Sequence, residues 1–511
     1  GAEIRQEVID FFTEHNHTVV PSCSLVPGGD STLLFTNAGM VQFKDVFLGT
    51  DQRPYNRAVN SQKCLRVSGK HNDLDQVGRD NTHHTFFEML GNWSFGDYYK
   101  KEAITWAWQL LTEVWELPKD RLWATYFKDE LDEIPEDQEA AEIWLSQPGF
   151  DPDHLLPFGR KENFWEMADT GPCGPDSEIH FDRGPAFCDC QDDPDHVCQV
   201  NGKCERFLEI WNNVFIQYNR LSETELVLLE KKHVDTGMGF ERIVSILQEA
   251  PSNYKTDLFM PLIRRVQEMT GDSNEAREAN LTPYRVIADH ARATAFLIAD
   301  GVVPGNIGRN YICRMLIRRA ARFGMKLGLD EPFMAKVAEV VINEYGDFYA
   351  ELKRNAPTIL DNLTREEQQF KKTVTAGLEH LNELLEKLKK EGGSVLDGEK
   401  AFDLYATLGL PLEITRDIAQ EQGLDVDTQG FQEAMEAHRL ASGAGQEFGE
   451  IGAEDVNIYS DLVEKLRESG KLSVDGVAYT PYEAIREPVE VLALVQDGQP
   501  VDQADKGEPV A

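Results

Sequence analysis

The most specific chemistry in this sequence lies in two arginines and the residues around them. The run Asp235-Thr-Gly-Met-Gly-Phe-Glu-Arg242 places two close glycines before an arginine, and Arg66 ends a strand-like segment far upstream. Close glycines alone often mark only the tight packing of a strand on a helix. Two guanidinium groups, however, are planar bidentate donors that never deprotonate, which suits a nucleotide whose phosphates must be bent and neutralised. The pair therefore predicts a nucleotide site that activates carboxylates.

Six further runs occur in a fixed order along the chain. They are Leu33-Leu-Phe-Thr-Asn-Ala-Gly-Met40, Lys70-His-Asn-Asp-Leu74, His83-His-Thr-Phe-Phe-Glu-Met-Leu-Gly-Asn92, Asp169-Thr-Gly-Pro-Cys-Gly-Pro175, Trp211-Asn-Asn-Val214 and Ala288-Asp-His-Ala-Arg292. In this order they resemble the alanyl-tRNA synthetase family of class II enzymes over residues 2 to 510. The resemblance implies an α+β class II fold and a reaction in which ATP and Mg²⁺ convert alanine into alanyl-adenylate for transfer to the 3′ end of tRNA(Ala).

Two other functions remain open at this point. An alanine-adenylating ligase would use the same site with an acceptor other than tRNA. A non-catalytic nucleic-acid-binding relative would lack the chemistry, and the set Arg66, Asp235 and Arg242 argues against it. Pyrophosphate exchange separates the last function from the others, and charging of a tRNA transcript separates the first two.

The resemblance assigns roles to the nucleotide-binding residues. Arg66 corresponds to the clamp on the α-phosphate, and Arg242 to the residue that covers the adenine and the outer phosphates. Phe87 resembles the aromatic on which adenine stacks, although an ordinary phenylalanine of a sheet core would read the same way. Gly239 belongs to the same ATP-binding motif as Arg242. Each charge that develops on the transferred group would then meet a preplaced donor.

The alanine pocket must hold an ammonium group, admit one methyl group and refuse larger side chains. We expect Asp235 to pair with the ammonium, because a buried carboxylate is the natural counter-charge for a small zwitterion. The resemblance makes Trp165 the wall that limits the pocket and Gly237 the position where the backbone approaches the substrate. One methyl group is worth only roughly 1–3 kcal/mol, and an added hydroxyl is rejected little better. We therefore expect misactivation of glycine and serine, which this chain has no editing site to correct.

Asn212 and Val214 complete the predicted pocket. A period of two along the strand-like segment 208–218 puts both side chains on one face, and both match pocket residues of the family. Glu209 falls on the opposite face unless the strand bulges. The magnesium ligands therefore stay unassigned.

Four of the eight cysteines lie within one turn-rich segment. These are Cys188, Cys190, Cys198 and Cys204. Four close thiols can surround one tetrahedral Zn²⁺ without long-range folding, and His196 lies in the same loop. The spacing is not that of a standard zinc finger, and free cytosolic thiols or a catalytic metal are the alternatives. We predict a structural zinc site in an insertion at 184–205.

A basic segment interrupts an otherwise acidic chain. The sequence has 51 basic and 89 acidic residues, and its net charge of −38 repels a polyanion at long range. Within 309–326 acids are nearly missing, and Arg314, Arg318 and Arg322 recur every four residues on one face of a helix. A solvated helix face is the alternative. We predict that this helix contacts the phosphates of a tRNA acceptor stem.

The resemblance also implies base readout of a G·U pair in the acceptor stem by an asparagine and an aspartate. The asparagine matches Asn306. The aspartate should fall in the run Phe402-Asp-Leu-Tyr-Ala-Thr-Leu-Gly409, where Ala406 stands instead. An alanine side chain accepts no hydrogen bond from a base amino group. We therefore expect weakened recognition of the wobble pair.

The periodicity of apolar residues predicts the scaffold that holds these groups. Helical spacing occurs at 2–15, 103–116 and 358–390, and strand-like segments occur at 56–67, 83–90, 122–127 and 207–218. Helices interleaved with hairpin-like strands predict an α+β domain with a largely antiparallel sheet. We predict a catalytic domain at 1–250, a helical tRNA-recognition domain at 251–447, and the start of a β-rich segment at 448–511 after a hinge at 442–453.

Composition is that of a large enzyme. A length of 511 residues with 41% hydrophobic content predicts about two to four domains with their own cores. No run of 18 apolar residues and no charged-then-apolar leader occurs, so neither a membrane span nor a signal peptide is predicted, and the expected compartment is the cytosol. The chain begins at Gly1 and its last residues read as half of a unit. We therefore expect a fragment of a longer protein of unknown oligomeric state.

Overall fold

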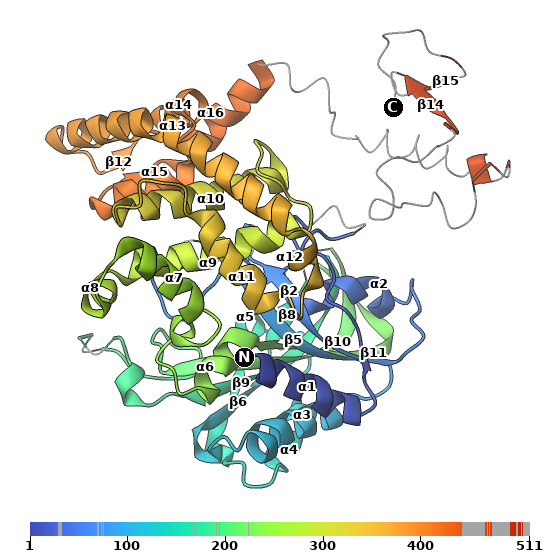
Figure 1. Ribbon diagram of the computed structural model, residues 1–511. Helices are drawn as coiled ribbons and strands as arrows, with labels where there is room; N and C mark the ends of the chain where they lie inside the picture. The colour runs from blue at the N-terminus through green and yellow to red at the C-terminus, as the bar shows by residue number, and fades with distance from the viewer. Residues whose placement is uncertain are drawn as a thin grey trace. The chain divides into compact units, whose positions relative to one another are not determined.

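The computed structural model describes most of the chain. The described residues are 1–28, 33–68, 71–72, 74, 76–167, 170–190, 192–193, 195–222, 224–441, 465–467, 469, 471–472, 491–496, 499–501 and 503. The chain divides into two units, Gly1–Leu378 and Glu379–Ala511, whose elements are labelled in Figure 1. Among the helices of the described residues, none is both long enough and apolar enough to cross a membrane.

Within the described residues, a nine-stranded sheet forms the centre of the first unit. Its spatial order is β1 (Thr18–Val19), β2 (Arg57–Leu65), β5 (Phe86–Phe95), β11 (Glu225–Gly239), β10 (Phe207–Ser222), β9 (Gly171–Asp182), β6 (Leu122–Phe127) and β7 (Leu155–Phe158), with β8 (Phe164–Glu166) paired to β9. The pairs β1·β2 and β6·β7 are parallel, and the other neighbours are antiparallel. A two-stranded ribbon joins β3 (Val67–Ser68) to β4 (His71–Asn72). The predicted α+β arrangement around a largely antiparallel sheet is confirmed.

The periodicity of the sequence does not predict two central strands of this sheet, β9 and β11. The segment predicted at 122–127 is β6, and three other predicted segments correspond to β2, β5 and β10. β9, in contrast, opens with glycine and proline, which are depleted in strands, and it is buried on both faces, so its sequence does not alternate. β11 has an exposed, charged first half and a buried second half. Both strands therefore read as irregular sequence.

Helices flank the sheet and continue the first unit beyond it. They are α1 (Ala2–Glu14), α2 (Lys44–Phe47), α3 (Lys100–Gln109), α4 (Gln138–Leu145), α5 (Arg160–Asn163), α6 (Phe240–Leu247), α7 (Met260–Thr270), α8 (Asn274–Ala279), α9 (Leu281–Ala299), α10 (Gly308–Lys326), α11 (Met334–Tyr345), α12 (Ala350–Arg354) and α13 (Ala356–Lys390). The helices predicted at 2–15, 309–326 and 358–390 correspond to α1, α10 and α13, and α3 runs into a π-helical turn at Leu110–Val114. In Figure 1, α1, α3 and α4 group at one border of the sheet, and α7, α9 and α11 at another.

Helix α9 is the most deeply buried of the helices that contact the sheet. Every residue from Pro283 to Ala299 is buried, including the charged residues Asp289 and Arg292. Its apolar side chains join those of β5, α7, α10 and α11 in one continuous core. Charges in such a position are costly unless they are paired, so the partners of Asp289 and Arg292 define what α9 holds in place.

The second unit contains the end of α13, a short helical segment at 465–467 and, among its described residues, three longer helices. The longer helices are α14 (Gly398–Leu408), α15 (Leu412–Glu421) and α16 (Thr428–Ala441), with the short strands β12 (Val395–Leu396), β13 (Asp425–Val426), β14 (Leu494–Gln496) and β15 (Gln499–Val501). Asp397 caps α14 by accepting a hydrogen bond from the Lys400 amide, and Gly409 ends it in the left-handed conformation. The predicted hinge at 442–453 lies outside the described residues. The three-part division at 250 and 447 stays a prediction.

Candidate active site

A cleft of about 680 Å³ opens on the sheet of the first unit. Its walls include all nine residues that the sequence assigned to ATP and alanine. They are Arg66, Phe87, Trp165, Asn212, Val214, Asp235, Gly237, Gly239 and Arg242. The volume is within the range of small-molecule sites. The structure therefore brings the predicted site residues together on one surface.

Strand register explains how the alanine-pocket residues meet. In the β10·β11 pair, Asn212 lies opposite Gly237 and Val214 lies opposite Asp235. Side chains two apart in a strand share a face, so these four positions form a square of neighbours facing the cleft. A side chain at Gly237 would collide with Met89, since a Cβ there would lie 2.8 Å from the Met89 sulfur. Only backbone atoms therefore form the floor of the cleft at Gly237.

Asp235 is a buried carboxylate in this floor. The indole Nε1 of Trp93 donates a hydrogen bond to its Oδ1 at 2.6 Å. Burial raises the pKa of Asp235 to about 7, although the bond from Trp93 acts in the opposite direction. Trp93 supplies a neutral donor and no charge. The group is thus suited to receive a cation of small size.

Arg66 and Phe87 lie side by side at the end of the β2·β5 hairpin where the connecting loop begins and ends. The Arg66 guanidinium carbon is 4.9 Å from the centre of the Phe87 ring, and its Nε donates to the Asn37 carbonyl at 3.2 Å. Phe87 is only half buried, because its neighbours Phe86 and Glu88 take the core face of β5. The alternative of an ordinary core phenylalanine therefore does not describe its position.

Arg242 lies in the first turn of α6 and is held by β10. Its Nη1 donates to the carbonyl of Glu209 at 2.9 Å and to the Glu209 carboxylate at 3.1 Å. The pairing of β10 with β9 shifts between Glu209 and Trp211, which is a β-bulge. Both Glu209 and Ile210 consequently line the cleft. The expectation that Glu209 faces away holds only for a regular strand and is corrected by this bulge.

Two further carboxylates of the cleft were not singled out by sequence reasoning. Asp176 and Glu178 lie on β9 and face the cleft beside Glu209. Burial raises the pKa of Asp176 well above its usual range and also raises that of Glu178. The Oδ1 of Asp176 is buried with no hydrogen-bond partner among the described residues. In the sequence, the only sign of these two carboxylates is that they follow closely after the run that ends at Pro175.

Trp165 forms one wall of the cleft on β8. It pairs with Gly174 of β9 and packs against the cluster that contains Phe43, Trp93 and Met167. The wall is completed by Glu166, whose carboxylate binds the Arg220 guanidinium at 2.6 Å. The indole of Trp165 is thereby held in place as one wall of the cleft.

The Cys-rich segment between β9 and β10 forms a compact group of possible metal ligands. Cys188, His196, Cys198 and Cys204 place one ligand atom each within 4.8 Å of one another. Cys190 is not in this group, and its thiol lies 3.9 Å from the Asp189 carboxylate instead. The group thus contains three of the four predicted cysteines together with His196. Hydrogen bonds with Cys188 and His196 lower the pKa of Cys198 to about 7.

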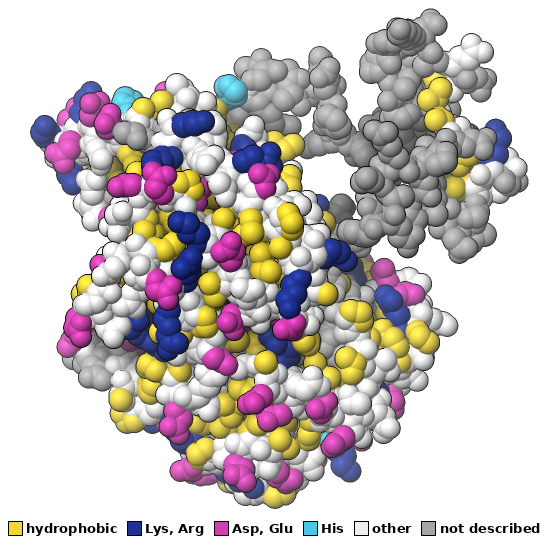
Figure 2. Space-filling model, in the orientation of Figure 1, with side chains coloured by type: hydrophobic (Ala, Val, Ile, Leu, Met, Phe, Trp, Pro, Cys, Tyr) yellow, Lys and Arg dark blue, Asp and Glu magenta, His cyan; other side chains and the backbone are white. Residues whose placement is uncertain are grey.

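The arginine face predicted on α10 is largely buried. Arg318 Nε lies 2.7 Å from the Glu366 carboxylate of α13, and Arg314 Nε lies 3.2 Å from the same group. Arg318 and Arg322 are buried, and only Arg314 is partly exposed. The alternative of a solvated helix face does not describe Arg318 and Arg322, because both are buried and α13 supplies an acid that the local sequence lacks. Contact of this helix with tRNA phosphates stays a prediction. Figure 2 accordingly shows basic and acidic side chains interspersed over the visible face.

The two positions expected to read the acceptor stem are both exposed. Asn306 lies in the loop before α10, and its Oδ1 accepts a hydrogen bond from Arg314 Nη1. Ala406 lies on α14 in the second unit. The structure thus leaves both side chains accessible, and neither is part of a core.

Comparison with known proteins gives a consistent result. The family described as tRNA synthetases class II (A) matches residues 3–511. Alanine–tRNA ligases of Roseiflexus sp. (strain RS-1) and Roseiflexus castenholzii are 47% identical over 100% of this chain and 54% of their own length. The alanine–tRNA ligase of Chloroflexus aurantiacus is 47% identical over 100% of this chain and 55% of its own length. The chain therefore spans about half the length of these relatives.

One solved structure is also similar in part. The apo histidyl-tRNA synthetase of S. aureus aligns with 48% of this chain and 65% of its own, at 10% identity and a TM-score of 0.29. So low a score carries no argument about the site.

Proposed function

This chain belongs to the class II (A) tRNA synthetases, and we propose that it activates alanine with ATP and transfers the alanyl group to the 3′ end of tRNA(Ala). The single observation that carries the proposal is the cleft that unites Asp235 with Arg66 and Arg242. An ammonium partner and two phosphate partners on one surface suit an amino acid carboxylate facing a bent nucleotide. The names of the similar ligases support alanine as the amino acid.

The proposed first step forms a mixed anhydride. A carboxylate oxygen of alanine attacks the α-phosphorus of ATP, the bond from that phosphorus to the bridging oxygen breaks, and pyrophosphate leaves with the electron pair. Arg66 would meet the charge that develops on the α-phosphate, and Arg242 would hold the leaving phosphates. Phe87 would support the adenine, and Gly239 lets the backbone beside it come close. A fixed donor of this kind commonly contributes about 10²–10³ in rate.

The proposed second step moves the alanyl group to RNA. A ribose hydroxyl at the 3′ end attacks the carbonyl carbon and gives up its proton to the departing phosphate, and the bond to the phosphate oxygen breaks, so that AMP leaves. During both steps Asp235 would keep the alanine ammonium in place. Asn212 and Val214 would line the pocket beside Gly237, and Trp165 would exclude larger side chains.

A divalent cation fits the carboxylates of the cleft. Asp176, Glu178 and Glu209 offer hard oxygen ligands, and the unpartnered oxygen of Asp176 together with its raised pKa is what a missing positive charge predicts. We propose that they hold Mg²⁺, which neutralises phosphate charge when it is bound. These residues would orient the outer phosphates against Arg242.

The cysteine and histidine group fits a structural zinc ion. Three sulfur ligands and one imidazole nitrogen at mutual distances within 4.8 Å suit a closed tetrahedral site. We propose that Cys188, His196, Cys198 and Cys204 hold Zn²⁺ and tie down the loop between β9 and β10. The cytosolic location expected for such thiols stays a prediction.

We propose that the acceptor stem of tRNA is contacted by Asn306 and Arg314. Arg314 is the part of the predicted arginine face that solvent reaches, and its bond to Asn306 holds the two side chains together. The burial of Arg318 and Arg322 limits the charge available for phosphates. This burial is also the observation that favours the second candidate function, alanine adenylation with an acceptor other than tRNA.

Two assays on one preparation separate these functions. Alanine-dependent exchange of pyrophosphate into ATP measures activation, and charging of a tRNA(Ala) transcript measures transfer. Exchange with charging supports the ligase, and exchange without charging supports the second candidate.

Asp235→Ala should abolish exchange while ATP binding persists. Asp137→Asn is the matched control, because Asp137 is a buried carboxylate that pairs with Lys100 outside the cleft.

A further inference from the structure

Helix α9 carries charged side chains at three positions of one face that reach toward the sheet. Arg285, Asp289 and Arg292 are spaced by four and three residues, so they lie on one face of the helix. Asp289 and Arg292 have no exposed surface. The cleft chemistry proposed above uses none of them, and their burial demands partners.

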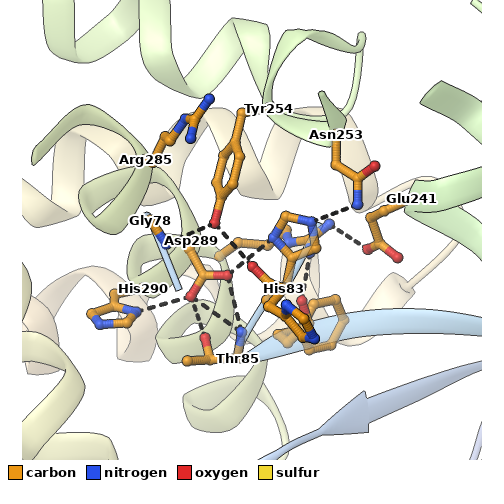
Figure 3. Close-up of polar contacts among 12 residues, drawn as sticks. Gly78, His83, Thr85, Glu241, Asn253, Tyr254, Arg285, Asp289 and His290 are labelled. Carbon is orange, nitrogen blue, oxygen red and sulfur yellow. Dashed lines mark hydrogen bonds and ion pairs between the residues drawn. The ribbon is translucent and has the colours of Figure 1, made fainter. Parts of the chain in front are cut away.

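Asp289 holds the end of the β2·β5 hairpin. Its carboxylate accepts a hydrogen bond from the Thr85 amide at 3.1 Å and another from the Thr85 hydroxyl. The Thr85 carbonyl in turn accepts a hydrogen bond from the Arg66 amide at 2.9 Å. Figure 3 shows Asp289 between Thr85 and His290, with Tyr254 on the other side. Only one backbone hydrogen bond therefore separates the Asp289 clamp from Arg66.

Arg292 holds the segment that bears the other arginine. Its Nη1 lies 2.7 Å from the Glu241 carboxylate, and Glu241 precedes Arg242 in α6. Its Nη2 donates to the Phe86 carbonyl at 2.5 Å. The Glu241 carboxylate also accepts a hydrogen bond from the Glu88 amide at 3.2 Å. Arg292 therefore ties the first turn of α6 to the same strand that Asp289 holds.

Arg285 adds contacts between α9 and the loop that joins β2 to β5. Its Nη1 donates to the Asp80 carbonyl at 3.0 Å and its Nη2 donates to the Asn81 side chain at 2.8 Å. The loop also carries His83, which lines the cleft. Helix α9 thus contacts the end of the loop beside Arg66 and, through Arg292, the first turn of α6 that bears Arg242.

We propose that Asp289 and Arg292 are positioning residues of the nucleotide site, Asp289 setting Arg66 through Thr85 and Arg292 setting Arg242 through Glu241. The proposal rests on the ATP-binding role given above to the two arginines. Both contacts are buried and made by a helix whose place is fixed by its own core packing. A displacement of about 1 Å at such a group can cost about a hundredfold in rate.

The competing interpretation is a purely structural network. A structural defect lowers the fraction of folded, active molecules but leaves the ATP affinity of the remaining molecules unchanged. A positioning defect weakens ATP binding and slows activation in every molecule, and it leaves alanine recognition by Asp235 intact. The Michaelis constants for the two substrates therefore separate the two interpretations.

The decisive variant is Thr85→Val, which removes the hydroxyl bond to Asp289 and keeps the shape and the backbone. Thr85→Ser restores the hydroxyl. Arg292→Lys keeps the charge but cannot reach both Glu241 and the Phe86 carbonyl. Thr294→Val is the matched control, since Thr294 is a buried threonine of α9 whose hydroxyl bonds only within the helix.

The experiment measures ATP binding by calorimetry and pyrophosphate exchange per titrated active site, with thermal unfolding as the check on folding. We expect Thr85→Val and Arg292→Lys to lower kcat/KM for ATP by about tenfold or more with KM for alanine within about twofold. Thr85→Ser and Thr294→Val should stay within about threefold of the parent on the same scale. A parent-like ATP affinity and kcat in Thr85→Val would overturn the proposal, and so would an equal rise in both Michaelis constants.

Failure of the proposed function has a different signature. A parent protein that binds ATP but shows no alanine-dependent exchange contradicts the ligase assignment. The effect of Thr85→Val on ATP binding then still decides whether Asp289 positions the site. If Arg292→Lys does not fold, the ATP affinity of Thr85→Val alone separates positioning from a structural network.

Discussion

Asp235 has a buried carboxylate whose pKa is raised. Burial raises its pKa to about 7, and its hydrogen bond from Trp93 only moderates that effect. In the free protein the folded-state pKa therefore lies above the unfolded value. The stability that the protonated form contributes is complete at low pH and is lost as the pH rises through about 7. An ammonium group in the pocket reverses this balance by favouring the ionised form.

We predict that alanine binding strengthens as the pH rises toward about 7, because the ammonium needs an ionised Asp235. The KM for alanine should fall by up to about tenfold per pH unit below that value and then level off. Steady-state exchange at saturating ATP measures it. Asp235→Asn should bind alanine weakly with no such dependence, and a flat profile in the parent would contradict the role of Asp235.

Ala406 is the residue at which base recognition is expected to be weak. We predict that the protein charges a G·U-bearing transcript with a preference over its G·C variant reduced by roughly 1–3 kcal/mol, because one hydrogen-bond acceptor is missing. Ala406→Asp should restore the preference. Charging of both transcripts by parent and variant at one salt concentration tests this. A strong preference in the parent that Ala406→Asp leaves unchanged would show that another residue supplies the acceptor.

The loop between β9 and β10 is the element whose integrity we expect to depend on metal. Purified protein should contain about one equivalent of Zn²⁺. Cys198→Ser with Cys204→Ser should remove the metal and destabilise the loop, and His196→Ala should weaken metal binding. Elemental analysis and thermal unfolding measure both effects. Activity should fall only in part, because the site is proposed as structural.

Cys190→Ser is the matched control for this site. Its thiol lies outside the ligand group, so zinc content should equal that of the parent. Equal zinc loss in Cys190→Ser and Cys198→Ser would restore the four-cysteine set predicted from sequence and would contradict the role of His196.

Helix α10 contains arginines with different roles. We predict that Arg314→Ala weakens charging of both transcripts about equally and flattens the salt dependence, since a phosphate contact carries no base information. Arg318→Ala should instead lower the unfolding temperature, because it leaves the Glu366 carboxylate with less compensation. Charging against salt concentration and calorimetric unfolding measure the two outcomes. A larger charging defect per folded molecule in Arg318→Ala than in Arg314→Ala would reverse this assignment.

The sequence predicts elements better than it predicts contacts between them. The period of two along β10 places Asn212 and Val214 correctly, and the helical period locates α10 and α13. Glu209 depends on a bulge, and Asp176 lies on a strand without alternation, so periodicity finds neither. The burial of Arg318 depends on an acid from α13, far along the chain. Such long-range partners are set by tertiary packing, which local pattern does not contain.

At the scale of the whole molecule, the net charge is unfavourable for RNA binding, whereas the cleft holds groups suited to a small substrate. A net charge of −38 opposes the approach of any polynucleotide. Basic and acidic groups alternate over the face shown in Figure 2, so no single broad basic field appears there. The cleft, in contrast, holds buried carboxylates such as Asp176 and Asp235. Activation of a small zwitterion should therefore be the robust part of the activity, and transfer to RNA the part most sensitive to salt.

We propose that one cleft activates alanine with Arg66, Arg242 and Asp235. Alanine-dependent pyrophosphate exchange tests it most directly, in the parent and in Arg66→Ala and Arg242→Ala. We predict clear exchange in the parent and a loss of about a hundredfold or more in each variant, the scale of one preorganised donor, with unfolding temperatures close to the parent. Exchange within about threefold of the parent in both variants would contradict the assignment of this cleft.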